Sequence, residues 1–171
     1  MNQTIRLFVA AALAAGAVSC GKSLVPDIEF PEDYTWFSDS ALGYRIAYPA
    51  HWRKEKDPPL TEAPDVVWGG ASFKTVLHDS LEAHLWITVL GPTDDFRRFV
   101  EEGEAERVVV GGRRGYESKM YLWGNMNRTV VFPGSDRYFF VQCAADPEVF
   151  DDFDDIFDAI FESFEVTGTG E

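Results

Sequence analysis

The chain has 171 residues with 29 acidic and 15 basic side chains, which gives a net charge of −14 at pH 7. Such an acidic surface repels phosphate backbones and anionic headgroups, which excludes nucleic-acid binding and electrostatic membrane docking as expected functions. A cationic partner or a divalent metal ion is compatible with this charge. The length is enough for one domain with a hydrophobic core.

Residues 1–19 are expected to be a signal peptide. Arg6 supplies a positive charge, and the uncharged apolar run 7–18 follows it, which matches the n-region and the h-region of a secretory signal. At a rise of about 1.5 Å per residue this run covers roughly 18 Å, which is too short for a hydrocarbon core of about 30 Å. We therefore expect export and cleavage, and no transmembrane helix here.

A cysteine comes directly after this segment. The sequence Ala17-Val18-Ser19-Cys20 resembles the lipobox of bacterial lipoproteins, whose cysteine is acylated, for example with palmitate, and becomes the first residue after cleavage. Ordinary cleavage after Ser19 is the alternative, and it would leave a soluble periplasmic protein. Two or more acyl chains hold a protein durably on a membrane, so the resemblance implies attachment through Cys20. Gly rather than Asp follows the cysteine, at position 21, and the resemblance to sorted lipoproteins of Gram-negative bacteria then implies the outer membrane, with the domain facing the periplasm.

The rest of the chain divides into a lipidated tether, residues 20–33, and a folded domain, residues 34–171. The tether has two prolines and no periodic pattern. In the domain, alternating apolar residues and Gly, Pro or polar punctuation predict mainly antiparallel strands. The predicted strands lie within 34–49 (two strands with a turn at 38–40), 66–77, 84–90, 106–110, 114–123, 127–133 and 137–145, with polar loops over 51–65 and 78–83.

Two helices are predicted among these strands. A short one runs between a capping Thr93 and Gly103. The last one starts with Asp146 as its N-cap and Pro147 in its first position, and it has an acidic outer face. Its apolar residues recur at spacings of three and four and predict the buried face: Phe150, Phe153, Phe157, Ile160 and Phe164.

Three of these features, in this order, resemble the PsbP-like superfamily. They are a strand ending in Tyr48-Pro49 and followed by Trp52, the middle helix DDFRRFVEEG, and a strand leading into a long helix that ends in Ser163-Phe164. The resemblance covers residues 36–166. It implies an α+β fold of one domain, an antiparallel sheet sandwiched by helices. It also implies a binding or assembly protein without catalytic residues, because that is how known members act.

Potential metal ligands gather at the loop between two predicted strands. His78, Asp79, Glu82 and His84 lie within seven residues and are of ligand types that zinc and related ions accept. Their spacing is not that of a recurrent zinc motif, and hairpin loops are polar in any case, so an ordinary loop is the alternative. Ser80 lies near both histidines, but neither an oriented base nor an oxyanion hole can be recognised for it.

His51, Trp52, Arg53 and Lys54 form a basic cluster in this acidic chain. Trp and Arg are enriched at binding hot spots, so the cluster is a candidate partner-binding patch. The alternative is a solvent loop in which Trp52 closes the core. A second candidate patch of the same kind lies around a later hairpin turn and comprises Trp123, Asn125 and Asn127.

Cys143 is the second cysteine of the chain. If Cys20 carries lipid, Cys143 has no partner for an intramolecular disulfide. Alternation over 137–145 places Phe139, Val141 and Cys143 on one face of a strand, so we expect a buried, unreactive thiol.

These features together predict a lipid-anchored envelope lipoprotein that acts as a non-enzymatic protein-binding or assembly module. We expect no cofactor, a membrane contact through the acyl chains on Cys20 and a protein partner in the envelope. A ligand- or cation-binding lipoprotein that uses the concave face of the sheet is the alternative, and a hydrolase is the third.

Overall fold

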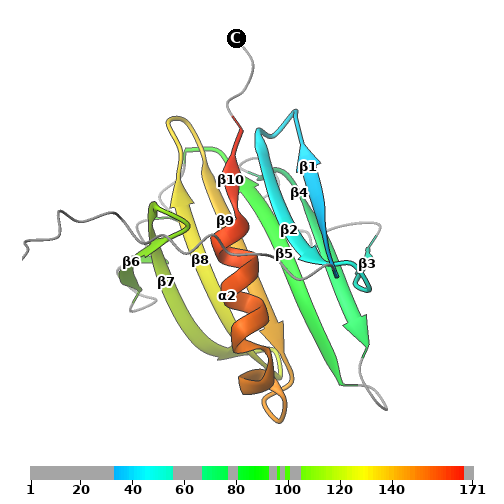
Figure 1. The fold of residues 1–171 in the computed structure, drawn as a ribbon. Coiled ribbons are helices and arrows are strands. Elements are labelled where there is room, and N and C mark those ends of the chain that lie inside the picture. The colour runs from blue at the N-terminus through cyan, green and yellow to red at the C-terminus, as the bar shows by residue number, and fades with distance from the viewer. Residues whose placement is uncertain are drawn as a thin grey trace, which may run out of the picture.

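The structure is a computed structural model and describes residues 33–55, 67–76, 81–92, 96, 99–100 and 105–167. Most of them lie in antiparallel strands, and a 3₁₀ turn leads into a helix near the end of the chain (Figure 1). The elements are β1 Tyr34–Asp39, β2 Tyr44–Pro49, β3 Arg53–Lys54, β4 Val67–Val76, β5 Glu82–Leu90, β6 Glu106–Val110, β7 Arg113–Leu122, β8 Asn125–Pro133, β9 Tyr138–Ala145, η2 Phe150–Phe153, α2 Asp154–Ser163 and β10 Glu165–Val166.

The strands form two sheets. The larger has seven strands in the order β3-β4-β5-β9-β8-β7-β6, and the smaller has three in the order β1-β2-β10. Every pairing in both sheets is antiparallel. The α+β class and the dominance of antiparallel strands are confirmed. The separate small sheet was not predicted.

Helix α2 and the small sheet lie side by side over one face of the large sheet, and the core fills the space between these two layers (Figure 1). Alternation along the central strands explains this arrangement, because every second side chain of β5 and β9 points to the same face. Apolar residues at those positions are removed from water, which is the main force that joins the layers. The side chains that β5 and β9 contribute are Ala83, Leu85, Ile87, Val89, Phe139, Val141, Cys143 and Ala145, each at most 1% exposed.

Aromatic side chains also cover part of the opposite face of the large sheet. Phe96 and Phe99 are helical, as predicted, although Thr93 and Gly103 lie outside the described residues. The Phe96 ring stacks on Tyr138 with the centroids 4.3 Å apart, and Phe99 meets Phe140 edge-on at 5.5 Å. Among the described residues, no helix is both long and apolar enough to cross a membrane.

The last helix starts later than predicted. Asp146 does not cap a helix: its Oδ1 accepts a hydrogen bond from the backbone N–H of Glu148 at 2.9 Å and forms a turn. The 3₁₀ turn η2 follows, and regular α-helix begins only at Asp154. A 3₁₀ turn has three residues per turn, so Phe150 and Phe153 both point into the core although they precede the α-helix. The predicted buried face is confirmed, and the predicted start is wrong.

One turn and two short strands also differ from prediction. The turn lies at 40–43, after the predicted 38–40, because Asp39 Oδ1 accepts the N–H groups of Ala41 and Leu42 at 3.0 and 2.9 Å. Arg53–Lys54 is a short strand paired with β4, where a loop was predicted. The two residues of β10 complete the small sheet and carry no sequence signal of their own, since strands this short show no alternation.

Ser163 fastens the end of α2 to β2. Its Oγ accepts a hydrogen bond from the N–H of Ala47 at 2.9 Å, and its hydroxyl lies 2.7 Å from the carbonyl of Ile160. The register of β10 on β2, with Glu165 opposite Arg45, places position 163 opposite Ala47. The serine side chain therefore supplies the partner that a longer β10 strand would have given to β2.

Replacing Ser163 by alanine is expected to destabilise the domain by about 1–3 kcal/mol, because it leaves the buried N–H of Ala47 without its acceptor. Urea unfolding followed by far-UV circular dichroism measures the loss. Ser135→Ala is the matched control, since Ser135 is exposed and its hydroxyl makes only a long hydrogen bond, 3.5 Å to Asp136 Oδ1, among the described residues. Equal stability of both variants would show that Ser163 does not carry this connection.

Candidate functional site

The basic cluster divides into a buried tryptophan and exposed cations. Trp52 is 3% exposed, and its ring meets Phe153 edge-on with the centroids 6.3 Å apart. Arg53 and Lys54 lie on β3 and are exposed, as is His51 before them. A partner at this surface would therefore contact the three basic side chains, while the indole of Trp52 packs in the core.

A hollow of about 300 Å³ lies beside this cluster and is lined by His51, Arg53, Lys74 and Thr75. Lys74 Nζ is 3.4 Å from Glu55 Oε1 and 3.7 Å from Glu82 Oε1. The two carboxylates offset much of the positive charge of the lysine. The positive charge of the hollow thus rests mainly on Arg53, and His51 adds a polar ring to its lining.

The predicted metal ligands are only partly described. His78 and Asp79 lie outside the described residues, whereas Glu82 and His84 are both on β5. Glu82 Oε2 lies 3.1 Å from His84 Nε2, and the imidazole stacks on Trp86 with the ring centroids 4.8 Å apart. Within the described ranges, no three His, Cys, Asp or Glu side chains form a group suited to a metal ion. The four-residue metal site stays a prediction.

The later hairpin, between β7 and β8, presents an exposed aromatic surface. Residues 121–125, here called the hairpin tip, include Tyr121, which is 65% exposed, and Trp123, which is 83% exposed. Trp123 and Gly124 have φ of 53° and 86°, so both central residues of the two-residue turn are left-handed, as a type I′ turn requires. The tip therefore places a large apolar ring in solvent from a backbone conformation that tryptophan rarely adopts.

The side chain of Asn127 forms hydrogen bonds with the backbone of the hairpin tip. Its Nδ2 donates to the carbonyls of Leu122 at 3.1 Å and Asn125 at 2.9 Å. Its Oδ1 accepts from Gln142 Nε2 at 2.7 Å, and the side chain is almost fully buried. Asn127 thus braces the tip rather than facing a partner, and of the predicted second patch Trp123 is the exposed member.

Tyr121 was predicted as a strand residue and was not recognised as a surface feature. It lies on the face of β7 that the helix covers, as do Glu117 and Lys119. Strand alternation alone would have placed it in the core, and it is exposed because η2 begins beside Lys119, whose Nζ lies 4.4 Å from the Phe150 ring centroid. Only the register of β7 against the helix layer reveals this exposure.

Cys143 is fully buried, as predicted. Burial raises the pKa of its thiol well above the usual value, and the nearby positive charge of Arg128 acts in the opposite direction. A buried, protonated thiol is a poor nucleophile. Cys143 is therefore a core residue and offers no site for covalent chemistry.

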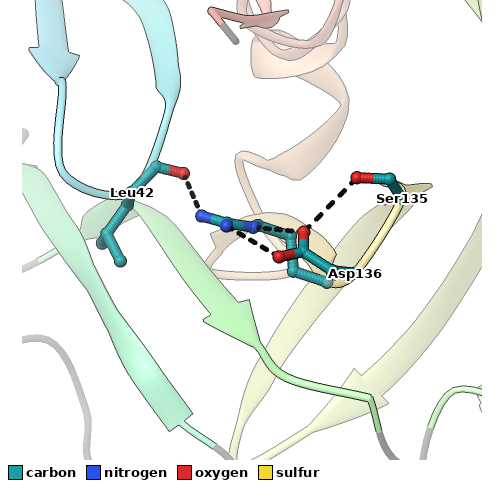
Figure 2. A network of polar contacts seen from close by, with 4 residues as sticks. Leu42, Ser135 and Asp136 are labelled. Atoms are coloured by element: carbon teal, nitrogen blue, oxygen red, sulfur yellow. Dashed lines mark hydrogen bonds and ion pairs between the residues drawn. The ribbon is translucent and has the colours of Figure 1, made fainter. Parts of the chain in front are cut away.

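A hydrogen-bond network around Arg137 lies at the end of the large sheet opposite the hairpin tip (Figure 2). The guanidinium donates to both carboxylate oxygens of Asp136, at 2.8 and 3.0 Å, and to the carbonyl of Leu42 at 3.2 Å. It also stacks over the Trp68 ring, 4.8 Å from the centroid. This network connects the β8–β9 turn with the β1–β2 turn and with β4, and it leaves the guanidinium occupied by the protein's own groups.

Arg137→Met is expected to destabilise the domain at pH 7, in part because the stacking on Trp68 contributes about 0.5–1 kcal/mol. Arg137 also holds the pKa of Asp136 below its ordinary value. A depressed carboxylate pKa stabilises the fold above the unfolded-state pKa, and this contribution disappears as the pH falls through the folded-state pKa. Thermal unfolding from pH 7 to pH 2 should therefore show the two proteins converging. A constant difference would contradict the Arg137–Asp136 linkage.

Solved structures of other proteins resemble this architecture. Cyanobacterial PsbP (CyanoP) from Synechocystis superposes with a TM-score of 0.55 at 17% identity, over 86% of this chain and 97% of that chain. A Bacteroides thetaiotaomicron protein gives 0.55 at 15% identity, over 80% of this chain and 49% of that chain. LpqN of Mycobacterium tuberculosis, described as involved in cell envelope biogenesis, gives 0.43 at 16% identity, over 82% of this chain and 88% of that chain.

Comparisons by sequence give a different result: no family model matches the chain, and a search of curated proteins finds no match. The structural likeness to CyanoP spans most of both chains, at an identity that carries information about the fold alone. The domain therefore has a PsbP-like fold, as the order of its strands, helices and Tyr-Pro and Ser-Phe motifs predicted.

Proposed function

We propose that this chain is a lipid-anchored envelope lipoprotein whose domain binds another protein as a non-enzymatic module. The observation that carries the proposal is the exposure of aromatic side chains, which are enriched in binding hot spots. Trp36 and Trp68 are 46% and 44% exposed, and Tyr121 and Trp123 at the hairpin tip are more exposed still.

Two of these aromatic residues already have partners in the domain. Arg45 lies over the Trp36 ring at 4.7 Å from its centroid, just as Arg137 lies over Trp68. Tyr121 and Trp123 have no ring or cation contact of this kind with any described residue. Binding energy is therefore most available at the hairpin tip, where a partner would remove the rings from water.

Anchoring in the envelope rests on the resemblance of residues 17–20 to a lipobox. Cys20 would carry the acyl chains, and residues 21–33 would separate the domain from the bilayer. Cys20→Ala tests this step: the variant should leave the membrane fraction and partition into the aqueous phase of a detergent extraction. A variant that stays with the detergent would show that something other than acyl chains holds the protein.

The binding function itself is tested by crosslinking in intact cells with an amine-reactive reagent. The full-length acylated protein should capture one recurrent envelope protein, identified by mass spectrometry. Absence of any captured protein above background would contradict the proposal.

A ligand-binding lipoprotein is the second candidate, and the hollow beside His51 and Arg53 is the observation that favours it. Binding of a ligand raises the stability of the folded chain by RT ln(1 + [L]/Kd). Thermal unfolding of the full chain with inorganic phosphate, Ca²⁺ or Zn²⁺ tests this candidate. An unchanged Tm with all three would contradict a ligand-binding function for phosphate-like anions and for these two cations.

A further inference from the structure

We propose that the hairpin tip, together with the carboxylates beside it, is the docking surface for a cationic segment of a partner protein. This inference rests on the proposed binding function and assigns it to one end of the domain. Three features of the described residues carry it: the conformation of the tip, the hydrogen bonds that hold it and the charge beside it.

The conformation of the tip is unfavourable for the residue that occupies it. Both central positions of a type I′ turn require positive φ, and Asn-Gly is the preferred pair. The chain has Trp123-Gly124 there, with Trp123 at φ 53° and 83% exposed. Neither packing within the domain nor turn propensity favours tryptophan at this position. A contact outside the domain is the physical reason that remains for a large aromatic ring there.

The tip is also held in one arrangement before any partner binds. Asn127 donates to the carbonyls on both sides of the turn and is itself fixed by Gln142. Leu122 and Asn125 are paired across the turn, which continues the regular register of β7 and β8. A surface ordered in advance loses little conformational entropy on binding, which favours affinity.

Carboxylates lie beside the tip and define the charge of the partner. Ala145, the last residue of β9, pairs with Met126 just below the turn, so the segment that follows β9 begins next to the tip. In Figure 1 this segment, drawn in orange, and the β7–β8 turn lie at the same end of the domain. We call its four partly or fully exposed carboxylates the acidic rim: Asp146, Glu148, Asp151 and Asp152.

An acidic rim beside exposed tryptophan and tyrosine rings is complementary to lysine and arginine side chains. Carboxylates attract the cations over a longer range, and a cation placed over an indole face gains a further cation–π interaction. The same rim repels anionic lipid headgroups, so the charge favours a protein over a membrane surface. Lys119 also lies at this end, with its ammonium over the Phe150 ring, and Arg53 follows Trp52, whose ring meets Phe153 of η2. The four carboxylates of the rim outnumber these two cations.

The test uses the full-length acylated chain in intact cells, with Tyr121→benzoylphenylalanine as the photoreactive probe. A second probe at Val109, which is 70% exposed on β6, is the position control. We expect the probe at 121 to give one protein adduct, whose crosslinked peptide is rich in lysine and arginine, and the probe at 109 to give none.

Trp123→Asn is the decisive variant, because it replaces the unfavourable residue of the turn by the preferred one. Its Tm should rise by about 2 °C. The adduct yield from position 121 should nevertheless fall at least about tenfold, as for loss of a hot-spot residue. Asp151→Asn combined with Asp152→Asn should also lower the yield while the Tm stays within about 2 °C of the parent.

Each other result overturns the inference. An unchanged yield with Trp123→Asn would show that the indole does not bind the partner. Adducts to lipid alone would place the tip at a bilayer. If position 121 gives no adduct while the amine-reactive reagent still captures an envelope protein, the docking surface lies elsewhere and the binding function stands. If neither method captures a protein, the inference and the proposed function both fail.

Discussion

Phe164→Ala should destabilise the domain by about 3–5 kcal/mol, the cost of truncating a buried phenylalanine and leaving a cavity. Phe164 is 1% exposed and follows directly after α2. Its ring stacks on Phe132 at 4.9 Å and contacts Phe139 at 5.4 Å and Tyr44 at 6.0 Å between centroids. One side chain therefore joins β8, β9 and β2, and its removal loosens both sheets at once.

Equilibrium unfolding in urea measures this loss. Phe164→Leu is the matched variant, because it keeps an apolar side chain and should cost less than the alanine. Tyr121→Ala is the surface control and should change the free energy of unfolding by less than about 0.5 kcal/mol. A loss below about 1 kcal/mol for Phe164→Ala would contradict the central place of this ring in the core.

Gly70→Ala is the second large effect, with an expected cost of about 3 kcal/mol or more. A Cβ at position 70 would lie 1.9 Å from the carbonyl oxygen of Ile87 and 3.2 Å from the Cα of Thr88, both on the neighbouring strand β5. Backbone atoms cannot move aside as a flexible side chain can. The added methyl group must therefore separate β4 from β5 where the two strands pair.

Gly112→Ala is the matched control for Gly70→Ala. Gly112 has φ of 75° and nothing within 4 Å of an added Cβ, so its cost comes from the backbone conformation alone, about 1–2 kcal/mol. Thermal and urea unfolding of both variants compare the two causes. A Gly70 variant no less stable than the Gly112 variant would show that β4 and β5 are not so closely apposed.

Strand alternation and helical periodicity predicted part of the core. Phe139, Val141 and Cys143 lie on the buried face, and the phenylalanines of the last helix pack as their spacing required. These features are local in sequence, so the sequence pattern contains them.

The remaining features depend on contacts between distant segments. Arg53–Lys54 and Glu165–Val166 become strands only because β4 and β2 offer them backbone partners. The late start of α2 follows from Asp146, which bonds to its own turn although it has the composition of a helix cap. Composition and periodicity do not distinguish these outcomes.

In the candidate site, too, some features are local in sequence and others depend on contacts between distant segments. Trp52 and its basic neighbours are adjacent in sequence, yet the indole packs on Phe153 while the cations face solvent. The hairpin tip and the acidic rim are about 25 residues apart in the chain, and the pairing of Met126 with Ala145 brings them to one end. A surface made from two segments is visible only once this register is known.

Zero-length carbodiimide crosslinking in intact cells tests the central claim most directly, because the reagent joins carboxylates to amines that are already in contact. The account predicts that mass spectrometry will map partner lysines to the acidic rim, through Asp151 or Asp152 above all, and that Trp123→Asn will remove these crosslinks. Crosslinks from the partner to carboxylates at the opposite end, such as Glu165 beside Arg45, would contradict it.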